Sequence, residues 1–256
     1  MSMPVLSSAA LTDTGRVRTH NEDAVHADPE TGLLIVADGM GGHKAGEVAS
    51  ALAIVRMREV MEKALASDPE PDSDTAGQLL KDAVQAANHA IFEAAESDPR
   101  YSNMGTTLVA GLLMGQHLHV AHVGDSRLYR FRDGQLECLT SDHSLVQEML
   151  DQGFYTPEQA SRASNRNIVT RAMGLQAEVE VTLQQYPLEQ ADLYLLCSDG
   201  LSDMLDENTI ALTLHQFGDN LDKAAHYLVD AANQAGGRDN ISVVLAVAGK
   251  AGCDGY

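Results

Sequence analysis

The distribution of apolar residues divides the chain into short strand-like runs and longer helix-like segments. Short apolar runs bounded by glycine, proline or aspartate predict β-strands, and they lie at residues 5–12, 24–27, 33–37, 106–114, 117–123, 128–132, 136–139, 179–183, 193–198 and 241–247. Apolar residues that recur every three or four positions predict helices, and they lie at residues 45–66, 75–96 and 221–235. Residues 144–153 and 157–163 have the pattern of two short helices in a polar insert.

The order of these elements predicts an α+β fold. The first two long helices are joined by a short acidic linker that contains Pro69 and Pro71. We therefore expect an antiparallel helix pair that packs on a sheet. Asp133-Gly134 lies between two strand-like runs and predicts a β-hairpin. The sequence has no internal repeat and no long linker, which favours one domain over residues 1–256.

The composition argues against several partners and locations. There are 37 acidic and 17 basic residues, and the net charge of −20 opposes binding to nucleic acid or to an anionic membrane. No apolar run reaches membrane-spanning length, and the N-terminus lacks the pattern of a secretory signal, so we expect a cytoplasmic protein. The cysteines at positions 138, 197 and 253 do not have the spacing of a disulfide framework or a zinc site.

Four aspartates stand at the predicted ends of buried strands. Asp38 and Asp199 each follow an apolar run and precede glycine, Asp125 follows Gly124 after a third run, and Asp239 precedes the last strand. A single Asp-Gly pair predicts only a turn, but the strand ends of one sheet can lie close together. Carboxylates with few histidine or cysteine partners are typical ligands of Mg²⁺ or Mn²⁺. Two such ions about 4 Å apart can share one carboxylate and activate a water for attack on phosphorus.

Eight short motifs, four of which contain these aspartates, follow one another along the chain. They are residues 18–24 (RTHNEDA), 36–43 (VADGMGGH), 105–107 (GTT), 123–127 (VGDSR), 141–144 (SDHS), 167–174 (NIVTRAMG), 197–203 (CSDGLSD) and 237–242 (GRDNIS). In this order they resemble the metal-dependent serine/threonine protein phosphatases of the PPM (protein phosphatase 2C) family, in their compact bacterial form. The resemblance implies a four-layer αββα sandwich, in which helix pairs flank two antiparallel β-sheets, and a flap insert at about residues 145–167.

The resemblance also implies the metal ligands. Asp38 would bridge two core ions, Mn²⁺ or Mg²⁺. The Gly39 carbonyl would bind one of these ions, while Asp199 and Asp239 would complete the shell of the other. Asp125, together with Asp199, matches a third ion site that is described for bacterial members.

Four further residues receive roles from the same resemblance. Glu22 would contact the metal shell directly or through water. Arg18 would hold the substrate phosphate, since its planar fork suits two phosphate oxygens. Asp23 would support the metal ligands by hydrogen bonding, and Asn240 would orient the ligand beside it.

One position departs from the pattern of some eukaryotic members. Those proteins carry a histidine directly after the Asp-Gly pair, where it is proposed to protonate the leaving oxygen, but this chain has Met40. His43 is the nearest histidine and becomes the candidate proton donor. Metal-bound water is the alternative, and His143 is a further candidate.

The predicted function is a protein serine/threonine phosphatase. It would hydrolyse phosphoserine or phosphothreonine with a water activated by two metal ions, act as a monomer and oppose a bacterial serine/threonine kinase. The alternative is a catalytically inactive, phosphopeptide-binding regulatory module on the same fold. The presence of every metal-ligand aspartate and of Arg18 favours the enzyme. A nucleotide-binding loop is excluded because Lys44 stands where its glycine is required, and no G-x-S-x-G elbow indicates a serine hydrolase.

Overall fold

The computed structural model of the chain describes residues 5–41, 45–160, 163, 165 and 168–249. Its strands are β1 (Val5–Asp13), β2 (Asp23–Asp28), β3 (Leu33–Met40), β4 (Gly105–Thr106), β5 (Leu108–Met114), β6 (His117–Val123), β7 (Arg127–Arg132), β8 (Gln135–Cys138), β9 (Thr182–Pro187), β10 (Leu193–Cys197) and β11 (Ile241–Gly249). Its helices are α1 (Ala45–Ser67), α2 (Ser73–Ser97), the 3₁₀ turn η1 (Pro99–Tyr101), α3 (Leu145–Asp151), α4 (Pro157–Ala160), α5 (Asp199–Ser202), α6 (Glu207–Phe217) and α7 (Leu221–Gln234).

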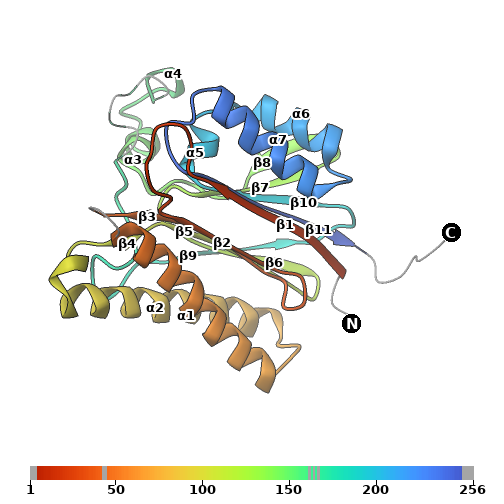
Figure 1. Cartoon of the computed structure of the whole chain (residues 1–256). Helices are drawn as coiled ribbons and strands as arrows, with labels where there is room; N and C mark the ends of the chain where they lie inside the picture. Colours follow the sequence, from red (N-terminus) through yellow and green to blue (C-terminus); the bar gives the residue numbers. More distant parts are fainter. Residues whose placement is uncertain (1–4, 42–44, 161–162, 164, 166–167, 250–256) are drawn as a thin grey trace.

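The strands form two antiparallel sheets that stack face to face (Figure 1). One sheet has the order β1-β11-β10-β7-β8, and the other has the order β2-β3-β5-β6-β9, with β4 paired to β3. Helices α1 and α2 cover the outer face of the second sheet, while α6 and α7 cover the first (Figure 1). These four layers confirm the expected α+β sandwich. No helix in the described part of the chain is long and apolar enough to cross a membrane.

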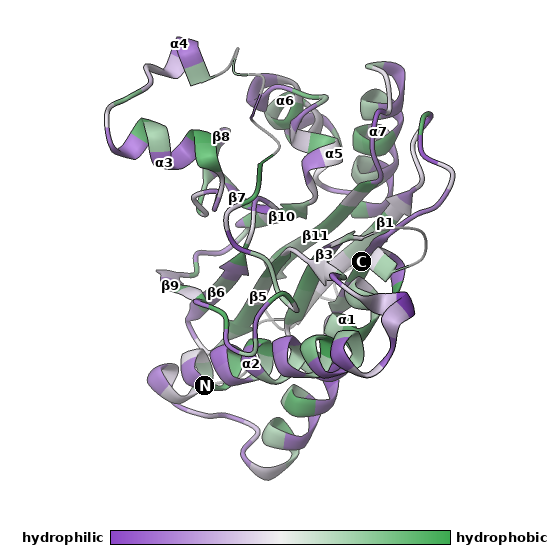
Figure 2. Cartoon of the chain, turned by 90° about the vertical axis from the view of Figure 1, so that its left-hand side faces the viewer, coloured by the Kyte–Doolittle hydropathy of each residue, from purple (hydrophilic) through white to green (hydrophobic). Residues whose placement is uncertain are grey.

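Strand β3 shows why the central strands are continuous apolar runs in the sequence. Successive side chains of a strand point to opposite faces. Leu34 and Val36 therefore pack into the core between the sheets, while Leu33, Ile35 and Ala37 pack against α1 and α2. Both faces of the strand are covered, so no polar alternation remains. Figure 2 shows the strands at the centre of the molecule mostly in the apolar colour and the outer helices with apolar and polar residues interspersed.

Several elements differ from the sequence prediction, and the short helices η1 and α5 were not predicted. Helix α6 was not expected, because only Ile210 and Leu214 of it are buried and the exposed Leu212 obscures the helical period. Strand β9 begins at Thr182, three residues later than predicted, since its buried and exposed positions alternate along a mostly polar stretch. The strand predicted at residues 106–114 is interrupted at Thr107, so it forms β4 and β5.

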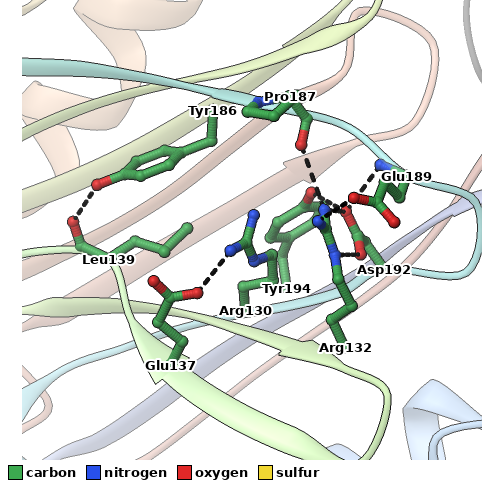
Figure 3. A network of polar contacts seen from close by, with 9 residues as sticks. All are labelled: Arg130, Arg132, Glu137, Leu139, Tyr186, Pro187, Glu189, Asp192 and Tyr194. Carbon is green, nitrogen blue, oxygen red and sulfur yellow. Dashed lines mark hydrogen bonds and ion pairs between the residues drawn. The ribbon is translucent and has the colours of Figure 1, made fainter.

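A network of polar contacts stabilises the beginning of β10 (Figure 3). The Asp192 side chain is fully buried, and both of its oxygens accept hydrogen bonds from Arg132 of β7, at 2.6 and 2.5 Å. The Tyr194 hydroxyl and the Glu189 backbone N–H also donate to Asp192, and Arg132 pairs with the Glu189 carboxylate. Every charge buried at this end of the strand therefore has a partner of opposite sign.

Candidate metal centre

The predicted site residues meet at one cavity, where β2 begins, β3 and β10 end and β11 begins. The cavity has a volume of about 370 Å³ and is lined by Arg18, Glu22, Asp38, Gly39, Met40, Gly41, Thr107, Asp125, Val169, Asp199, Asp239 and Asn240. Eight of the ten predicted site residues are in this lining. Asp23 lies behind it, buried beside Asp38. His43, the candidate proton donor, lies outside the described residues, as does part of the flap predicted at residues 145–167.

The register of the β2–β3 hairpin places two carboxylates side by side. Asp23 pairs directly with Asp38 across the antiparallel strands, and directly opposed side chains on such a pair are close neighbours. Gly39, the next residue, lies against the start of α1. A Cβ atom on Gly39 would lie 2.2 Å from the Gly46 carbonyl oxygen and 2.5 Å from that of Glu22. Only glycine therefore lets the strand end, the helix and the Glu22 backbone approach so closely.

The opposite sheet contributes Asp199 and Asp239. Strand β10 runs antiparallel to β11 with Cys197 opposite Val243, so the residue after one strand and the residue before the other lie at the same edge of the sheet. Asp199 begins α5, and a Cβ atom on Gly200 would lie 1.9 Å from the Asn240 carbonyl oxygen. Asp125 enters from the β6–β7 connection of the sandwich. Both sheets thus supply carboxylates to one cavity.

Asn240 connects the segment before β2 to the segment before β11. Its Oδ1 accepts a hydrogen bond from the Glu22 backbone N–H at 2.8 Å. Its Nδ2 donates to the carbonyl oxygens of Thr14, at 3.0 Å, and His20, at 2.9 Å. Its backbone N–H donates to Asp239 Oδ1 at 2.9 Å. Asn240 was expected only to orient Asp239; its backbone N–H contacts Asp239, while its side chain holds the loop that carries Arg18.

The carboxylates in the cavity have raised pKa values. Burial, followed by repulsion from neighbouring aspartates, raises the pKa of Asp38 well above its usual range. Burial and the charges of Asp125 and Asp239 raise the pKa of Asp199 to about 8. Burial also raises the pKa of Asp23 to about 6 and that of Asp125 to about 6. Desolvation and nearby like charges both disfavour ionised carboxylates, so this cavity attracts positive charge.

The two ends of β10 show the difference between a paired and an unpaired aspartate. Burial acts to raise the pKa of Asp192, but hydrogen bonds from Arg132, Glu189 and Tyr194 outweigh it and lower the pKa. Asp199, at the other end, forms no ion pair with any basic side chain in the described part of the chain, and burial and the neighbouring aspartates raise its pKa. Its Oδ1 and the Oδ1 of Asp23 are buried and have no hydrogen-bond partner among the described residues. A buried charge without a partner is costly, and a divalent cation bound by oxygen ligands would remove this cost.

The carboxylates do not form a ready-made ligand cage. Among the described residues, no three His, Cys, Asp or Glu side chains are gathered closely enough to hold a metal ion. Asp239 is also engaged by Arg18, whose Nη2 lies 2.6 Å from Asp239 Oδ2. Mg²⁺ usually keeps several waters in its shell, so loosely spaced carboxylates around an open cavity fit such an ion. The donor set, which is carboxylate and carbonyl oxygen, fits Mn²⁺ or Mg²⁺.

Four lining residues were not among the predicted site residues, namely Met40, Gly41, Thr107 and Val169; Met40 and Gly41 adjoin the predicted ligands Asp38 and Gly39 in the sequence. The Thr107 hydroxyl oxygen accepts a hydrogen bond from the backbone N–H of Asp38 at 3.3 Å. Val169 forms an apolar part of the cavity wall. The sequence placed Thr107 and Val169 in family motifs but gave no chemical signal for a role. His143, the further proton-donor candidate, does not line the cavity. Its ring nitrogens contact the Gly124 N–H and the Thr182 hydroxyl.

Comparisons with known proteins identify the family of the chain. A family model described as protein phosphatase 2C matches residues 14–236. The chain is 43% identical over 244 residues to the serine/threonine protein phosphatase PstP of Mycobacterium tuberculosis, which covers 94% of this chain and 45% of PstP. It is 38% identical over 237 residues to the serine/threonine phosphatase stp of Listeria monocytogenes, which covers 91% of this chain and 92% of that protein. This chain thus spans less than half the length of PstP.

Solved structures give the same result. The crystal structure of M. tuberculosis PstP matches with a TM-score of 0.88 at 43% identity and covers 96% of this chain and 99% of that one. A structure of the PstP catalytic domain in complex with two manganese ions matches with a TM-score of 0.83 at 43% identity and covers 95% of this chain and 98% of that one. The family resemblance predicted from the motifs is confirmed. This chain belongs to the protein phosphatase 2C family.

Proposed function

We propose that the chain is a metal-dependent phosphatase that hydrolyses phosphoserine or phosphothreonine in proteins. The observation that carries this proposal is the cavity that brings Arg18 together with Glu22, Asp38, Asp199 and Asp239. Its carboxylates suit hard cations, and its arginine suits a phosphate group. The names of PstP and stp, both serine/threonine phosphatases, support the same activity.

The carboxylates would hold two core ions. Asp38, near the end of β3, lines the same cavity as Glu22, which precedes β2, and as Asp199 and Asp239, which adjoin strands of the other sheet. Asp38 would be the ligand that the two ions share. When bound, the ions would supply an activated water and neutralise charge on the phosphoryl oxygens. The Gly39 carbonyl and Glu22 would complete one side of the site, and Asp125 with Asp199 would serve a third ion.

Arg18 would bind the phosphate of the substrate. Its side chain is about half exposed, at 52%, at the mouth of the cavity, where it bonds Asp239 at 2.6 Å. Burial acts to lower the pKa of Arg18, but the charge of Asp239 and the hydrogen bond to it raise the pKa. The guanidinium is thus a permanent cation that can turn from Asp239 to two phosphate oxygens. Its planar fork would hold the phosphoryl group in line for attack and would stabilise the developing charge.

The residue that donates a proton to the leaving oxygen is still a prediction. His43 keeps this role as a proposal, although it lies outside the described residues. His143 is a poor donor, because burial, the charge of His122 and that of Arg171 lower its pKa to about 4. A general acid works best when its pKa lies near the working pH, and His143 is also not among the residues that line the cavity.

The substrates and wider context belong to the same proposal. The substrates would be phosphorylated proteins, among them a serine/threonine kinase or its targets. We propose that residues 1–256 form one domain, that residues 145–167 form its flap and that it acts as a monomer without nucleic acid. The charge of −20 supports the last point.

The test is turnover of p-nitrophenyl phosphate and of a phosphothreonine peptide, with and without Mn²⁺. The wild type is compared with Asp38→Ala, and Asp28→Ala is a matched control, since Asp28 lies at the far end of the same β2–β3 hairpin. We expect Mn²⁺-dependent turnover that is lost in Asp38→Ala and kept in Asp28→Ala. Turnover without metal, or full activity of Asp38→Ala, would refute the mechanism. Tight peptide binding without turnover would favour the regulatory module.

A further inference from the structure

His143 is joined to the residue before Asp125 by two hydrogen bonds. The His143 backbone N–H donates to the Gly124 carbonyl oxygen at 2.9 Å. The Gly124 backbone N–H donates to His143 Nδ1 at 3.1 Å. Because Nδ1 accepts a hydrogen bond, it carries no proton, so the ring is neutral with its proton on Nε2. One residue therefore holds both backbone polar groups of Gly124.

The ring of His143 is itself fixed by two further contacts. Its Nε2 lies 3.0 Å from the Thr182 hydroxyl, at the start of β9. The ring stacks on the buried His122 ring, with centroids 4.6 Å apart and planes 16° apart. His122 Nε2 in turn lies 2.9 Å from the Ser141 carbonyl oxygen. A side chain held at both nitrogens and on one face cannot change rotamer without breaking several contacts.

On its other side, His143 contacts the cavity wall. Its carbonyl oxygen accepts a hydrogen bond from the Thr170 N–H at 2.8 Å. The next residue, Ser144, forms an antiparallel bridge with Val169, which lines the cavity. His143 thus lies between two parts of the site that are far apart in the sequence, namely the Asp125 turn and the Val169 wall.

The turn formed by Gly124 and Asp125 (the Asp125 turn) is packed against Thr107 on the side away from His143. Gly124 has a φ of +107°, and a Cβ atom on it would lie 2.6 Å from Thr107 Cβ. Thr107 is fixed in turn by a contact of 2.7 Å between its hydroxyl and that of Ser126. The turn is therefore enclosed by Thr107 on one side and by His143 on the other. Asp125 is only 9% exposed, so its position depends on these two supports.

We propose that His143 is a positioning residue that holds the Asp125 carboxylate in place for metal binding and couples it to the cavity wall at Val169. The proposal rests on the proposed function in one respect, since it takes Asp125 as a ligand of the third ion. His143 does not touch substrate in this role. Its effect reaches the site through the Gly124 backbone.

The experiment measures Mn²⁺ binding by isothermal titration calorimetry and the exchange of the Gly124 amide proton by NMR. His143→Leu removes the acceptor, while His143→Asn places a side-chain oxygen near the position of Nδ1. Asp125→Asn gives the effect of losing the ligand itself. His119→Leu is the matched control, because His119 is a buried histidine on β6 that contacts Ser73 rather than the Asp125 turn. Thr182→Val removes the partner of Nε2 alone.

We expect His143→Leu to weaken the Mn²⁺ site that Asp125→Asn impairs, roughly 10- to 100-fold, the usual effect of removing a residue that orients a metal ligand. Gly124 amide exchange should accelerate in the same variant. His143→Asn should restore most of both properties, and His119→Leu should change neither. If His143→Leu does not fold, Thr182→Val should still weaken the same site and accelerate exchange of the same amide. Wild-type Mn²⁺ binding in the folded His143→Leu variant, or otherwise in Thr182→Val, would overturn the proposal.

Asp125→Asn separates this proposal from the proposed function. If it binds Mn²⁺ like the wild type, Asp125 is not a ligand and the positioning role is wrong, while metal-dependent turnover by the wild type still supports the phosphatase. If Asp125→Asn and His143→Leu both weaken Mn²⁺ binding but the wild type hydrolyses no phosphopeptide, the positioning role stands and the phosphatase proposal fails.

Discussion

Arg18 donates a hydrogen bond from Nη2 to Asp239 Oδ2 at 2.6 Å, so the residue proposed to bind phosphate contacts a residue proposed to bind metal. Substrate phosphate and Asp239 therefore compete for the same guanidinium. We expect Arg18→Ala to lower kcat/KM for a phosphothreonine peptide by about 10²–10³, the usual effect of removing one charge-stabilising donor. Mn²⁺ affinity, measured by calorimetry, should be unchanged or higher, because Asp239 loses its protein cation.

Two controls make this prediction specific. Arg18→Lys should recover only part of the activity, since an ammonium group cannot form the two parallel hydrogen bonds of a guanidinium. Arg16→Ala should remain close to wild type, because Arg16 does not line the cavity. Equal losses in the Arg16 and Arg18 variants would show that the loop as a whole, and not the Arg18 guanidinium, is responsible.

The second prediction compares the two aspartates that flank β10. Without metal, Asp199→Asn should stabilise the protein by at least about 1.4 kcal/mol, the value of one pKa unit, because it removes a buried carboxylate that the neighbouring aspartates repel. Asp192→Asn should destabilise it by about 3 kcal/mol, because it breaks the buried pair with Arg132. Urea unfolding in EDTA measures both changes. With saturating Mn²⁺, the advantage of Asp199→Asn should disappear. The same sign for the two variants in EDTA would contradict the assignment of Asp199.

The third prediction concerns pH. The pKa values of Asp23 and Asp125 are raised to about 6, and that of Asp199 to about 8. Between pH 4 and pH 8 the folded state therefore binds more protons than the unfolded state. Stability of the metal-free protein should fall as pH rises through this window, by about 1.4 kcal/mol per pH unit for each such proton.

Thermal unfolding from pH 5 to pH 8 in EDTA measures this fall. Mn²⁺ should reduce it, since the ion binds the ionised carboxylates and so stabilises the protein most at the higher pH. The net charge of −20 acts in the same direction as the buried carboxylates. The Asp199→Asn variant separates the contribution of the Asp199 carboxylate from that of the net charge, because it should flatten the dependence of metal-free stability on pH between pH 6 and pH 8. A metal-free stability that rises with pH would contradict the raised pKa values.

The fourth prediction concerns Asn240. Asn240→Ala removes three hydrogen bonds to the segment that carries Arg18 and Glu22, so we expect a loss of about 2–3 kcal/mol in stability. KM for the peptide should rise more than kcat falls, because the Arg18 loop loses its support. Asn233→Ala is the matched control, as this buried asparagine bonds Asp13 instead. It should cost stability without changing KM, and a similar rise of KM in both variants would refute the specific role.

Much of the fold could be predicted because its central strands are buried on both faces. Leu33–Ala37 and Leu193–Cys197 are continuous apolar runs, and such runs can only be inner strands or buried helices. Helix α6 could not be predicted in the same way. It is held by the burial of Ile210 and Leu214 against α7 and the first sheet, and that packing leaves only two apolar positions as a signal.

The site residues could be predicted as a set, but their connections could not. Asp38, Asp199 and Asp239 are recognisable because each stands beside a glycine or turn at a strand end. Their convergence depends on the stacking of two sheets, which no local pattern records. The contacts of Asn240 with Thr14 and His20, and of His143 with Gly124, join residues far apart in the chain, so they appear only in three dimensions.

The pairing of charges at the two ends of β10 also predicts which end of the β-sandwich unfolds first. At the Asp192 end, Arg132 and Tyr194 hydrogen-bond to the Asp192 carboxylate, and these bonds need no metal ion. At Asp199 the adjoining carboxylates repel one another. The metal-free protein should therefore open first at the cavity, with amide exchange in β10 fastest near Cys197 and slowest near Leu193. Metal binding would then stabilise this end of the sandwich, so that the proposed active site would also be the part of the metal-free fold that unfolds most readily.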